Sequence, residues 1–419
     1  MFGMVLSVKS STSSMQGSSI HAAHLDKVDL MDPFDSPHST EKLARWRQTG
    51  DPLADAVICE LAEHGTDARR ELEIGINSGL HAVALPRPAL RAFLANCEEA
   101  GAAETAAMRR GSNAYLSIGA TWIALSLGPG SLTHTYSSPS IARVLAATGN
   151  LTRMAERRLL ETGRWNTASV VPGALMTGQP GYVHNVQVRL LHARVRHALL
   201  QNGWPNSNGV PINQLELART WLDFTFVPFA ALQRLGITFT KSELRDLYSL
   251  WHRIAALIGV DPGLYRPVTD QASGARLLSA IDARAEAPDT NSQQLTSAML
   301  EAVATLLAPR LGVGKAASIE LGRAIVRRLH GDDLADQLGV PRTPVSILLP
   351  ALVLMNRVRR MWLRPSSLRY ERAITSTLAA FAEADRDFIG QTTYERSLVT
   401  PIVKDAPAMM PASGDNSVP

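Results

Sequence analysis

The stretch "VRLLHARVRHALL" (Val188–Leu200) combines an apolar helical pattern with several basic side chains. Residues three and four apart share one face of a helix, so Arg189, His192 and Arg196 line up along one side. A buried guanidinium group needs an anionic partner, because an unpaired charge inside a protein is very costly. A cofactor with carboxylates or phosphates would supply that partner, and an imidazole between the arginines would ligate a metal. This combination suits haem, with iron on His192 and propionates on the arginines.

The same helix has a simpler interpretation. A histidine on an apolar helix is often a hydrogen-bonded core residue, and arginines often extend along apolar surface to place their charge in water. Both interpretations stay open for this stretch taken alone.

A second stretch, "ERRLLETGRW" (Glu156–Trp165), places Arg158 and Thr162 one helical turn apart on a common face. A turn rich in glycine and proline (Val170–Tyr182) follows it, which predicts that two helices return antiparallel. Thr162 would then face His192 across a pocket and hydrogen-bond a ligand or a water there. The alternative is that Arg158 pairs with a glutamate of its own helix and Thr162 is a fraying residue near the helix end.

Other candidate sites are weaker. His184 precedes the Val188 stretch and is expected in a loop or cap. Trp251 is expected in the core, and His252 is a poor second ligand. The glycines of Ser126–Leu132 lack the Lys-Ser/Thr of a phosphate loop, and Arg327–Pro344 resembles a DNA-binding turn only superficially. No HExxH, GxSxG or CxxC pattern occurs, which argues against zinc proteases, serine hydrolases and dithiol redox enzymes.

The composition excludes several classes of protein. With 45% hydrophobic and 19% charged residues, the 419-residue chain can bury a large core. The net charge of +4 is small and the arginines are scattered, so no nucleic-acid partner is expected. Cys59 and Cys97 show neither a disulfide framework nor metal-type spacing, which suits a reducing compartment. Apolar runs such as Val345–Met355 are too short to span a bilayer, so a cytoplasmic protein without a transmembrane segment is expected.

The elements that position these residues are predicted to be helices. Alternating, β-branched runs bounded by turns are scarce, and none predicts a strand. The sequence predicts a single large all-α domain over residues 41–395. Residues 1–40 and 396–419 are rich in serine, proline and small residues and are expected to be disordered. The polar segment Arg284–Gln294 is expected to be a loop within the domain. Helix starts are predicted at four positions: Ser138-Pro139, with an end at Gly149, then Asn213 with Glu216, Thr240 with Glu243, and Thr343-Pro344.

Four ordered blocks resemble one known family. They are "VLAATGNLTRMAERRLLETGRW" (144–165), "VRLLHARVR" (188–196), "GVPINQLELARTWLDFTF" (209–226) and "ALQRLGITFTKSELRDLYSLWHRIAALIGV" (231–260). This pattern is similar to that of the rubber oxygenases (latex clearing proteins) and MpaB-type oxygenases, over a motif core of about residues 142–266. The resemblance implies an all-helical catalytic domain with a globin-like core around haem b. It also implies oxygen chemistry on lipophilic substrates, which in the rubber oxygenases is cleavage of isoprenoid double bonds.

The resemblance also implies roles for single residues. His192 matches the proximal haem ligand, so it would hold the iron. Arg158 and Thr162 match the motif pair near the haem pocket, and are expected to act in catalysis. Arg189 and Arg196 match the arginines beside the ligand, and are expected to bind the cofactor.

Two departures from the family pattern concern the chemistry. Glu161 stands where the rubber oxygenases carry a lysine that can cap the distal side of the iron. They also use an upstream glutamate as a proposed base, whereas Thr135–Leu151 contains no acidic residue. Haem binding therefore carries over better than the rubber-cleaving mechanism.

The sequence as a whole predicts a haem b-dependent oxygenase with His192 as the proximal ligand. Dioxygen would bind on the opposite side of the iron and react with a small lipophilic substrate, isoprenoid or otherwise unsaturated. Two alternatives stay open. One is a haem-binding sensor or peroxidase-like protein without oxygenase turnover, and the other is a helical interaction protein without a cofactor. The oligomeric state, the distal ligand and the catalytic base are not determined.

Overall fold

The computed structural model describes residues 37–147 and 155–399, and this part of the chain is all-α, without a strand. The all-α prediction is thus confirmed. The expected disorder of the two ends and the helix end at Gly149 fall largely or wholly outside the described residues. A globin-like core stays a prediction, as do the domain limits.

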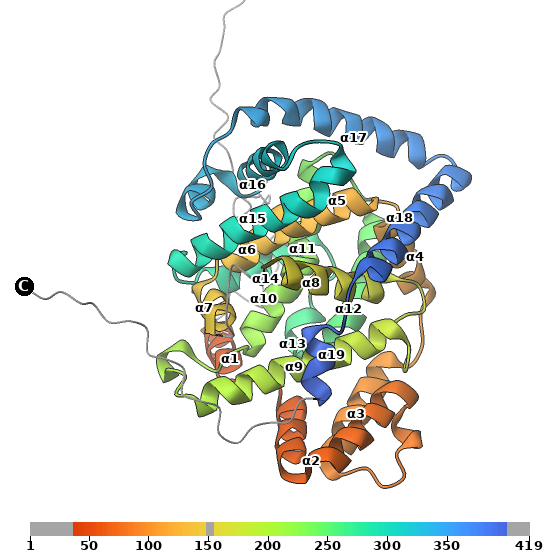
Figure 1. Ribbon diagram of the computed structural model, residues 1–419, viewed down its shortest axis with the longest axis vertical. Coiled ribbons are helices and arrows are strands. Elements are labelled where there is room, and N and C mark those ends of the chain that lie inside the picture. Colours follow the sequence, from red (N-terminus) through yellow and green to blue (C-terminus); the bar gives the residue numbers. More distant parts are fainter. Residues whose placement is uncertain (1–36, 148–154, 400–419) are drawn as a thin grey trace, which may run out of the picture.

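The helices and short helical turns follow one another around a common core (Figure 1). They are α1 (Pro37–Arg47), α2 (Pro52–Ser78), η1 (Leu80–Ala82), α3 (Pro88–Gly101), α4 (Ala106–Leu116), α5 (Ala120–Leu125), the π-helix η2 (Ser126–Leu132), α6 (Thr133–Tyr136), α7 (Pro139–Ala147), α8 (Ala155–Val170), α9 (Pro180–Gln201), η3 (Asn206–Asn208), α10 (Gln214–Phe224), α11 (Phe226–Arg234), α12 (Lys241–Leu257), α13 (Pro262–Tyr265), α14 (Gln271–Asp282), α15 (Thr290–Leu311), α16 (Lys315–Gln337), η4 (Pro344–Leu348), α17 (Leu349–Leu363), α18 (Ser367–Asp387) and α19 (Thr393–Val399).

Local capping chemistry explains several helix starts. Asn213 accepts hydrogen bonds from the backbone N–H groups of the first turn of α10. Thr240 and Glu243 form the predicted capping box of α12, in which each side chain accepts from the other residue's backbone N–H. Thr343 caps η4, which leads into α17. The predicted loop after Arg284 is shorter than expected, because Asp289 caps α15 and the helix already begins at Thr290.

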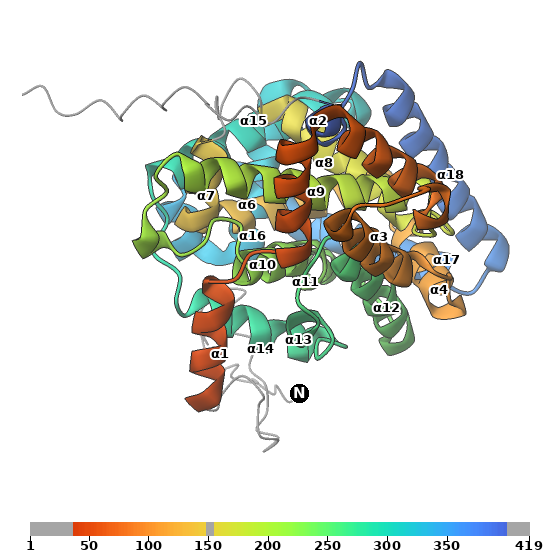
Figure 2. The same ribbon diagram turned by 90° about the horizontal axis from the view of Figure 1, so that it is seen from below.

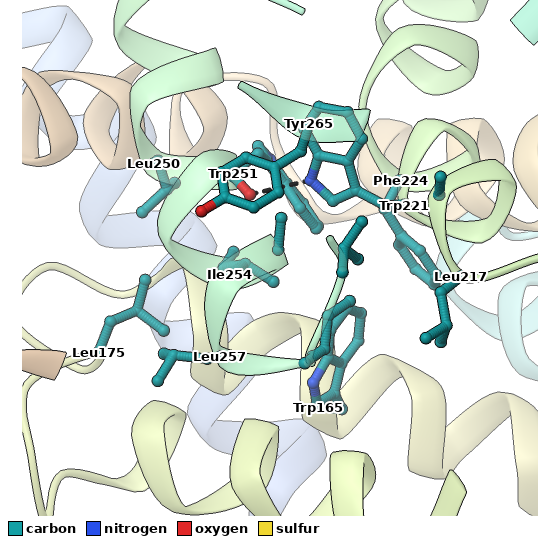
Figure 3. Close-up of a cluster of buried hydrophobic side chains, with 14 of the residues drawn as sticks. Trp165, Leu175, Leu217, Trp221, Phe224, Leu250, Trp251, Ile254, Leu257 and Tyr265 are labelled. Atoms are coloured by element: carbon teal, nitrogen blue, oxygen red, sulfur yellow. Dashed lines mark hydrogen bonds between the residues drawn. The ribbon is translucent and has the colours of Figure 1, made fainter. Parts of the chain in front are cut away.

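The main hydrophobic core draws residues from many helices between α1 and α19, and a group of aromatic rings within it lies between α8, α10 and α12 (Figure 3). The ring of Trp165 meets the edge of Phe224 at 4.9 Å between centroids, and Phe224 stacks on Trp251 at 5.9 Å. Trp251 is fully buried, as predicted, and its carbonyl oxygen accepts a hydrogen bond from Trp221 Nε1 at 2.9 Å. These ring contacts join α8 to α10 and α12.

A second core cluster lies between α15 and α16 and the η2 segment. Trp122 is partly buried and packs against both clusters, so the two form continuous apolar packing. The helices α2 and α3 lie at one end of the molecule, while α17 runs along the opposite edge (Figure 1). Seen from below, α2 crosses α9 (Figure 2).

Candidate functional site

The helices α8 and α9 carry the predicted site and pack against each other. Asn185 joins them through hydrogen bonds at two levels. Its Oδ1 accepts from Trp165 Nε1 at 3.0 Å, and its Nδ2 donates to Ser169 Oγ at 2.8 Å. All three side chains are buried, so these bonds fix the register of one helix on the other.

This register agrees with the predicted antiparallel pair. Seven residues, or about two turns, lead back from Trp165 to Arg158 on α8, and seven lead forward from Asn185 to His192 on α9. Arg158 and His192 therefore lie at similar heights along the pair, with Thr162 one turn away. The short connection of residues 171–179 closes the pair, as the glycine and proline content predicted.

His192 has a lowered pKa and a ring nitrogen without a described hydrogen-bond partner. Burial, with help from the positive charge of Arg196, lowers its pKa to about 4. Its Nδ1 atom is buried and has no hydrogen-bond partner among the described residues. The alternative of a hydrogen-bonded core histidine would require a partner for Nδ1, and none is described. A neutral imidazole is also the form that ligates metals.

The apolar surface beside His192 is incompletely covered. On α9, Val188 lies four positions before His192, Leu191 one position before it and Val195 three positions after it. Each of the three is only partly buried. On α8, Gly163 faces open space, since a Cβ there would meet no described atom within 4 Å. An apolar ring system placed against these residues would gain contacts that the described chain does not supply.

The two arginines beside His192 have carboxylate partners within the protein. Their charges therefore do not require the cofactor with carboxylates or phosphates that the sequence suggested. The guanidinium of Arg189 donates from Nε to Asp51 Oδ2 at 2.6 Å and from Nη2 to Asp51 Oδ1 at 3.0 Å. Arg196 donates to Asp55 Oδ1 at 2.9 Å and to the carbonyl oxygen of Ile212 at 2.8 Å. The anions that the arginines require thus come from α2, and propionate binding by Arg189 and Arg196 stays an untested prediction.

The pair of Arg189 and Asp51 is built into the fold. Burial opposes the charge of Arg189, but the Asp51 carboxylate outweighs it and raises the pKa of the guanidinium. Gly259 lies directly against the pair with a φ of 82°, where a Cβ would come within 2.3 Å of Asp51 Oδ2. Only glycine suits this position, on both counts.

Sequence reasoning missed Asp51 and Asp55 as partners, although a local signal was present. In "GDPLAD", an aspartate before a proline predicts a helix start, and Asp51 does cap α2 by accepting from Ala54 N at 3.2 Å. That the same carboxylate also meets Arg189, 138 residues away, follows only from the packing of α2 on α9.

Arg158 and Thr162 lie on a partly exposed face of α8. Burial raises the pKa of the Tyr136 phenol on α6 to about 12. The positive charge of Arg158 lies near this phenol and partly opposes the rise. Arg158 Nη1 also lies 3.5 Å from the carbonyl oxygen of Leu145. The region around the motif pair therefore holds a fixed positive charge beside a protonated phenol.

Glu161 is engaged elsewhere. Its Oε1 accepts from Arg157 Nε at 3.0 Å and from the backbone N–H of Thr393 at 3.0 Å, so it ties α8 to α19. Glu161 thus anchors α19, the last described helix, to α8. Among the described contacts, the arginine that pairs with Glu161 is Arg157.

A buried acidic group does lie beside the segment that lacks acidic residues. Asp223 on α10 accepts from His134 Nδ1 and Thr135 Oγ1, each at 2.7 Å. Burial and Arg219 lower the pKa of His134, but the carboxylates of Asp223 and Asp282 outweigh them and raise it. The sequence search for a nearby acid failed because Asp223 reaches this place from a different helix.

The remaining candidates have structural roles. His184 lies inside α9 and is buried, so the predicted loop or cap position is wrong. Its Nε2 lies 3.9 Å from Glu395 Oε1. His252 Nε2 is 2.7 Å from the carbonyl oxygen of Val268, which accounts for this ring. The Ser126–Leu132 segment forms the π-helix η2 and is no phosphate loop.

Comparison with known families decides the relationship. The model of the family "ER-bound oxygenase mpaB/B'/Rubber oxygenase, catalytic domain" matches residues 116–360, more than half of the chain. The chain belongs to this family. The match contains α8, α9 and the site residues on them, and it extends well beyond the motif core at 142–266. Asp51 and Asp55 lie before its first residue.

A solved structure supports the family's fold for most of the chain. The structure of latex clearing protein in the closed state superposes with a TM-score of 0.61 at 16% sequence identity, covering 88% of this chain and 95% of that chain. At this identity the likeness concerns the fold. No curated protein matches the chain.

Two features of the described site fit a haem, and a third does not require one. The neutral imidazole of His192, with a buried nitrogen that has no described partner, suits an iron ligand, and the apolar surface of α9 beside it suits a flat macrocycle. The charge of Arg189 does not require a propionate, because the Asp51 carboxylate already neutralises it. Within the described ranges, no helix is long and apolar enough to cross a membrane.

Proposed function

We propose that the chain is a haem b-dependent oxygenase that acts on a small lipophilic substrate, isoprenoid or otherwise unsaturated. Membership of the family supports an oxygenase, and one observation on this chain carries the cofactor. That observation is the neutral imidazole of His192, whose buried Nδ1 lacks a described partner. When bound, the haem would supply the iron that activates dioxygen.

The residues of α8 and α9 would have distinct tasks. His192 would hold the iron through a ring nitrogen, and its lowered pKa favours the unprotonated imidazole that ligation requires. Thr162 would donate a hydrogen bond from its hydroxyl to dioxygen or a water, and the charge of Arg158 would stabilise negative charge that develops there. Val188 and Val195 would exclude water and contact the lipophilic substrate or the macrocycle.

The arginines on α9 would contribute in different ways. Arg189 would position His192 by fixing α9 on α2 through the buried Asp51. Propionate contact remains proposed for Arg196, because the side chain of its partner Asp55 is 38% exposed and can exchange the arginine for water. A cytoplasmic location also remains a prediction.

The first experiment is an absorption spectrum of the full chain, expressed with iron and a haem precursor, with a pyridine haemochrome assay. His192→Ala is compared with wild type and with His184→Ala. His184 is a matched control, since it lies on the same helix and shares with His192 a buried Nδ1 that has no described hydrogen-bond partner, whereas only His192 matches the family's iron ligand. We expect near-stoichiometric haem b in wild type and His184→Ala and its loss in His192→Ala.

The outcomes separate the alternatives. A colourless wild type would overturn the cofactor assignment and favour the helical interaction protein. A haem-containing protein that consumes no dioxygen with any lipophilic substrate would favour the sensor or peroxidase-like protein. Equal haem loss in both variants would show that His192 is not the ligand.

A further inference from the structure

The helix α17 presents its apolar face outward. Six outward positions follow the helical spacing of three or four residues and form one stripe. Five of them carry large apolar side chains. The stripe comprises Ala351, Leu354, Met355, Val358, Met361 and Trp362, all of which are exposed. Met361 is 74% exposed and Trp362 58%. Ile347 and Leu348 of η4 and Leu368 of α18 extend the same apolar surface.

The opposite face of α17 buries Leu349, Val353 and Leu363 together with two polar side chains, and the hydrogen bonds of those two fix this orientation. Asn356 is fully buried and donates from Nδ2 to the carbonyl oxygen of Leu235 at 2.8 Å. Arg360 is buried and donates to Ser117 Oγ at 2.9 Å. Rotating the helix about its axis to bury Leu354 and Met361 would break both hydrogen bonds. It would also leave the partners of Asn356 and Arg360 without these contacts inside the protein. The outward apolar stripe is therefore a stable feature of the fold.

The surroundings of the stripe are positively charged. From Gln337 to Tyr370 the chain contains six arginines and no aspartate or glutamate. Arg342, Arg357 and Arg364 are exposed. Arg364 also donates to Glu243 Oε2 at 3.2 Å and Arg342 lies 3.6 Å from Asp332 Oδ2, so these two charges are partly neutralised from outside the segment, whereas Arg357 adds to the positive rim. The guanidinium carbon of Arg369 lies 4.5 Å above the ring of Trp362 at the end of the stripe. In Figure 1, α17 runs along the edge of the molecule, where a flat surface could reach it.

We propose that α17, with η4 and the start of α18, docks on the surface of an anionic lipid bilayer. An exposed apolar stripe with a tryptophan and a rim of arginines is the pattern of a helix that lies in the membrane interface. Fifteen residues are too few to cross a bilayer, so the helix would lie flat. A second copy of the chain is disfavoured as the occupant, because face-to-face contact would bring the arginine rims together without any acidic residue from this segment between them.

The proposal does not depend on the haem. The test is co-sedimentation of the full chain with vesicles of phosphatidylglycerol and phosphatidylcholine, compared with vesicles of phosphatidylcholine alone. The variants are Leu354→Glu combined with Met361→Glu, then Arg357→Gln alone, and the control is Leu85→Glu. Leu85 is a highly exposed leucine at a distance in the sequence from α17. Far-UV circular dichroism and the Tm confirm that each variant folds.

We expect binding to the anionic vesicles, a loss of at least about tenfold in the double variant, and a loss of about fivefold for Arg357→Gln. Leu85→Glu should bind like wild type, and salt should weaken binding by wild type. Absence of binding to either vesicle by wild type, or unchanged binding by the double variant, would overturn the proposal.

Light scattering provides the other decisive result. A dimer that the double variant dissociates, without vesicle binding, would assign the stripe to a second copy instead. Vesicle binding only after removal of residues 400–419 would assign it to that segment.

Discussion

Asp51→Asn removes the charge of one buried ion pair while it preserves most other contacts. Asparagine has the same shape as aspartate and is an equally good N-cap, so the start of α2 should stay intact. The guanidinium of Arg189 would keep its hydrogen bond to Asn96 Oδ1 at 2.9 Å but lose Asp51, its one carboxylate partner among the described residues. The perturbation is therefore an uncompensated cation inside the protein.

The magnitude follows from the burial of the pair. The side chains of Arg189 and Asp51 are each only 5% exposed. Breaking such a pair costs about 3–5 kcal/mol, and we expect about 3 because the amide oxygen still accepts one hydrogen bond. The matched control is Asp55→Asn at the neighbouring pair with Arg196. Its carboxylate is much more exposed, so solvent screens the charge and the expected cost is about 1 kcal/mol or less.

The assay is urea unfolding of the full chain followed by circular dichroism at 222 nm, which yields the free energy of unfolding. At a slope of about 3 kcal/mol per molar, Asp51→Asn should lower the midpoint by about 1 M. Combining Asp51→Asn with Arg189→Met should recover much of the loss, because it removes the orphaned charge. Equal small losses for both single variants, or no recovery in the combined variant, would refute the reasoning.

Three further changes test separate parts of the structure. The pKa of His192 falls from 6.5 to about 4 on folding, so its contribution to stability is complete above pH 6.5 and is lost as the pH falls toward 4. In the haem-free protein, His192→Gln should flatten the pH dependence of unfolding over that range by about 1–3 kcal/mol, and an unchanged profile would contradict the assignment of a neutral ring. In the haem-free protein, Gly163→Ala should raise the Tm, with a gain of about 0.5–1 kcal/mol, because the helix interior favours alanine and the space beside it is open. A fall in Tm would mean that this space is filled. Thr240→Ala should cost about 1 kcal/mol in urea unfolding through loss of the capping box, whereas Thr240→Ser should cost little; equal costs would argue against the cap.

The helical elements were predictable because their signals are local. Apolar periodicity, the capping residues Asn213 and Thr240, and the turn between α8 and α9 each depend on residues a few positions apart. The same local reasoning failed for His184, which was expected before the helix. The proline at the first turn of α9, Pro180, marks the true start and was assigned to the preceding turn.

Local signals also miss the outward face of α17. Its apolar run is periodic and would ordinarily predict a face that packs on the core. The buried partners of Asn356 and Arg360 come from distant helices, so the sequence could not show which side of α17 faces inward.

The sequence by itself determined the all-α class, the family and the helices that carry His192, Arg158 and Thr162, because spacing along a helix decides which side chains share a face. Only the tertiary structure decided what those side chains meet. The carboxylates that neutralise Arg189 and Arg196 come from a helix more than a hundred residues earlier. An ion pair over such a separation depends on how two helices cross, and no local pattern encodes that.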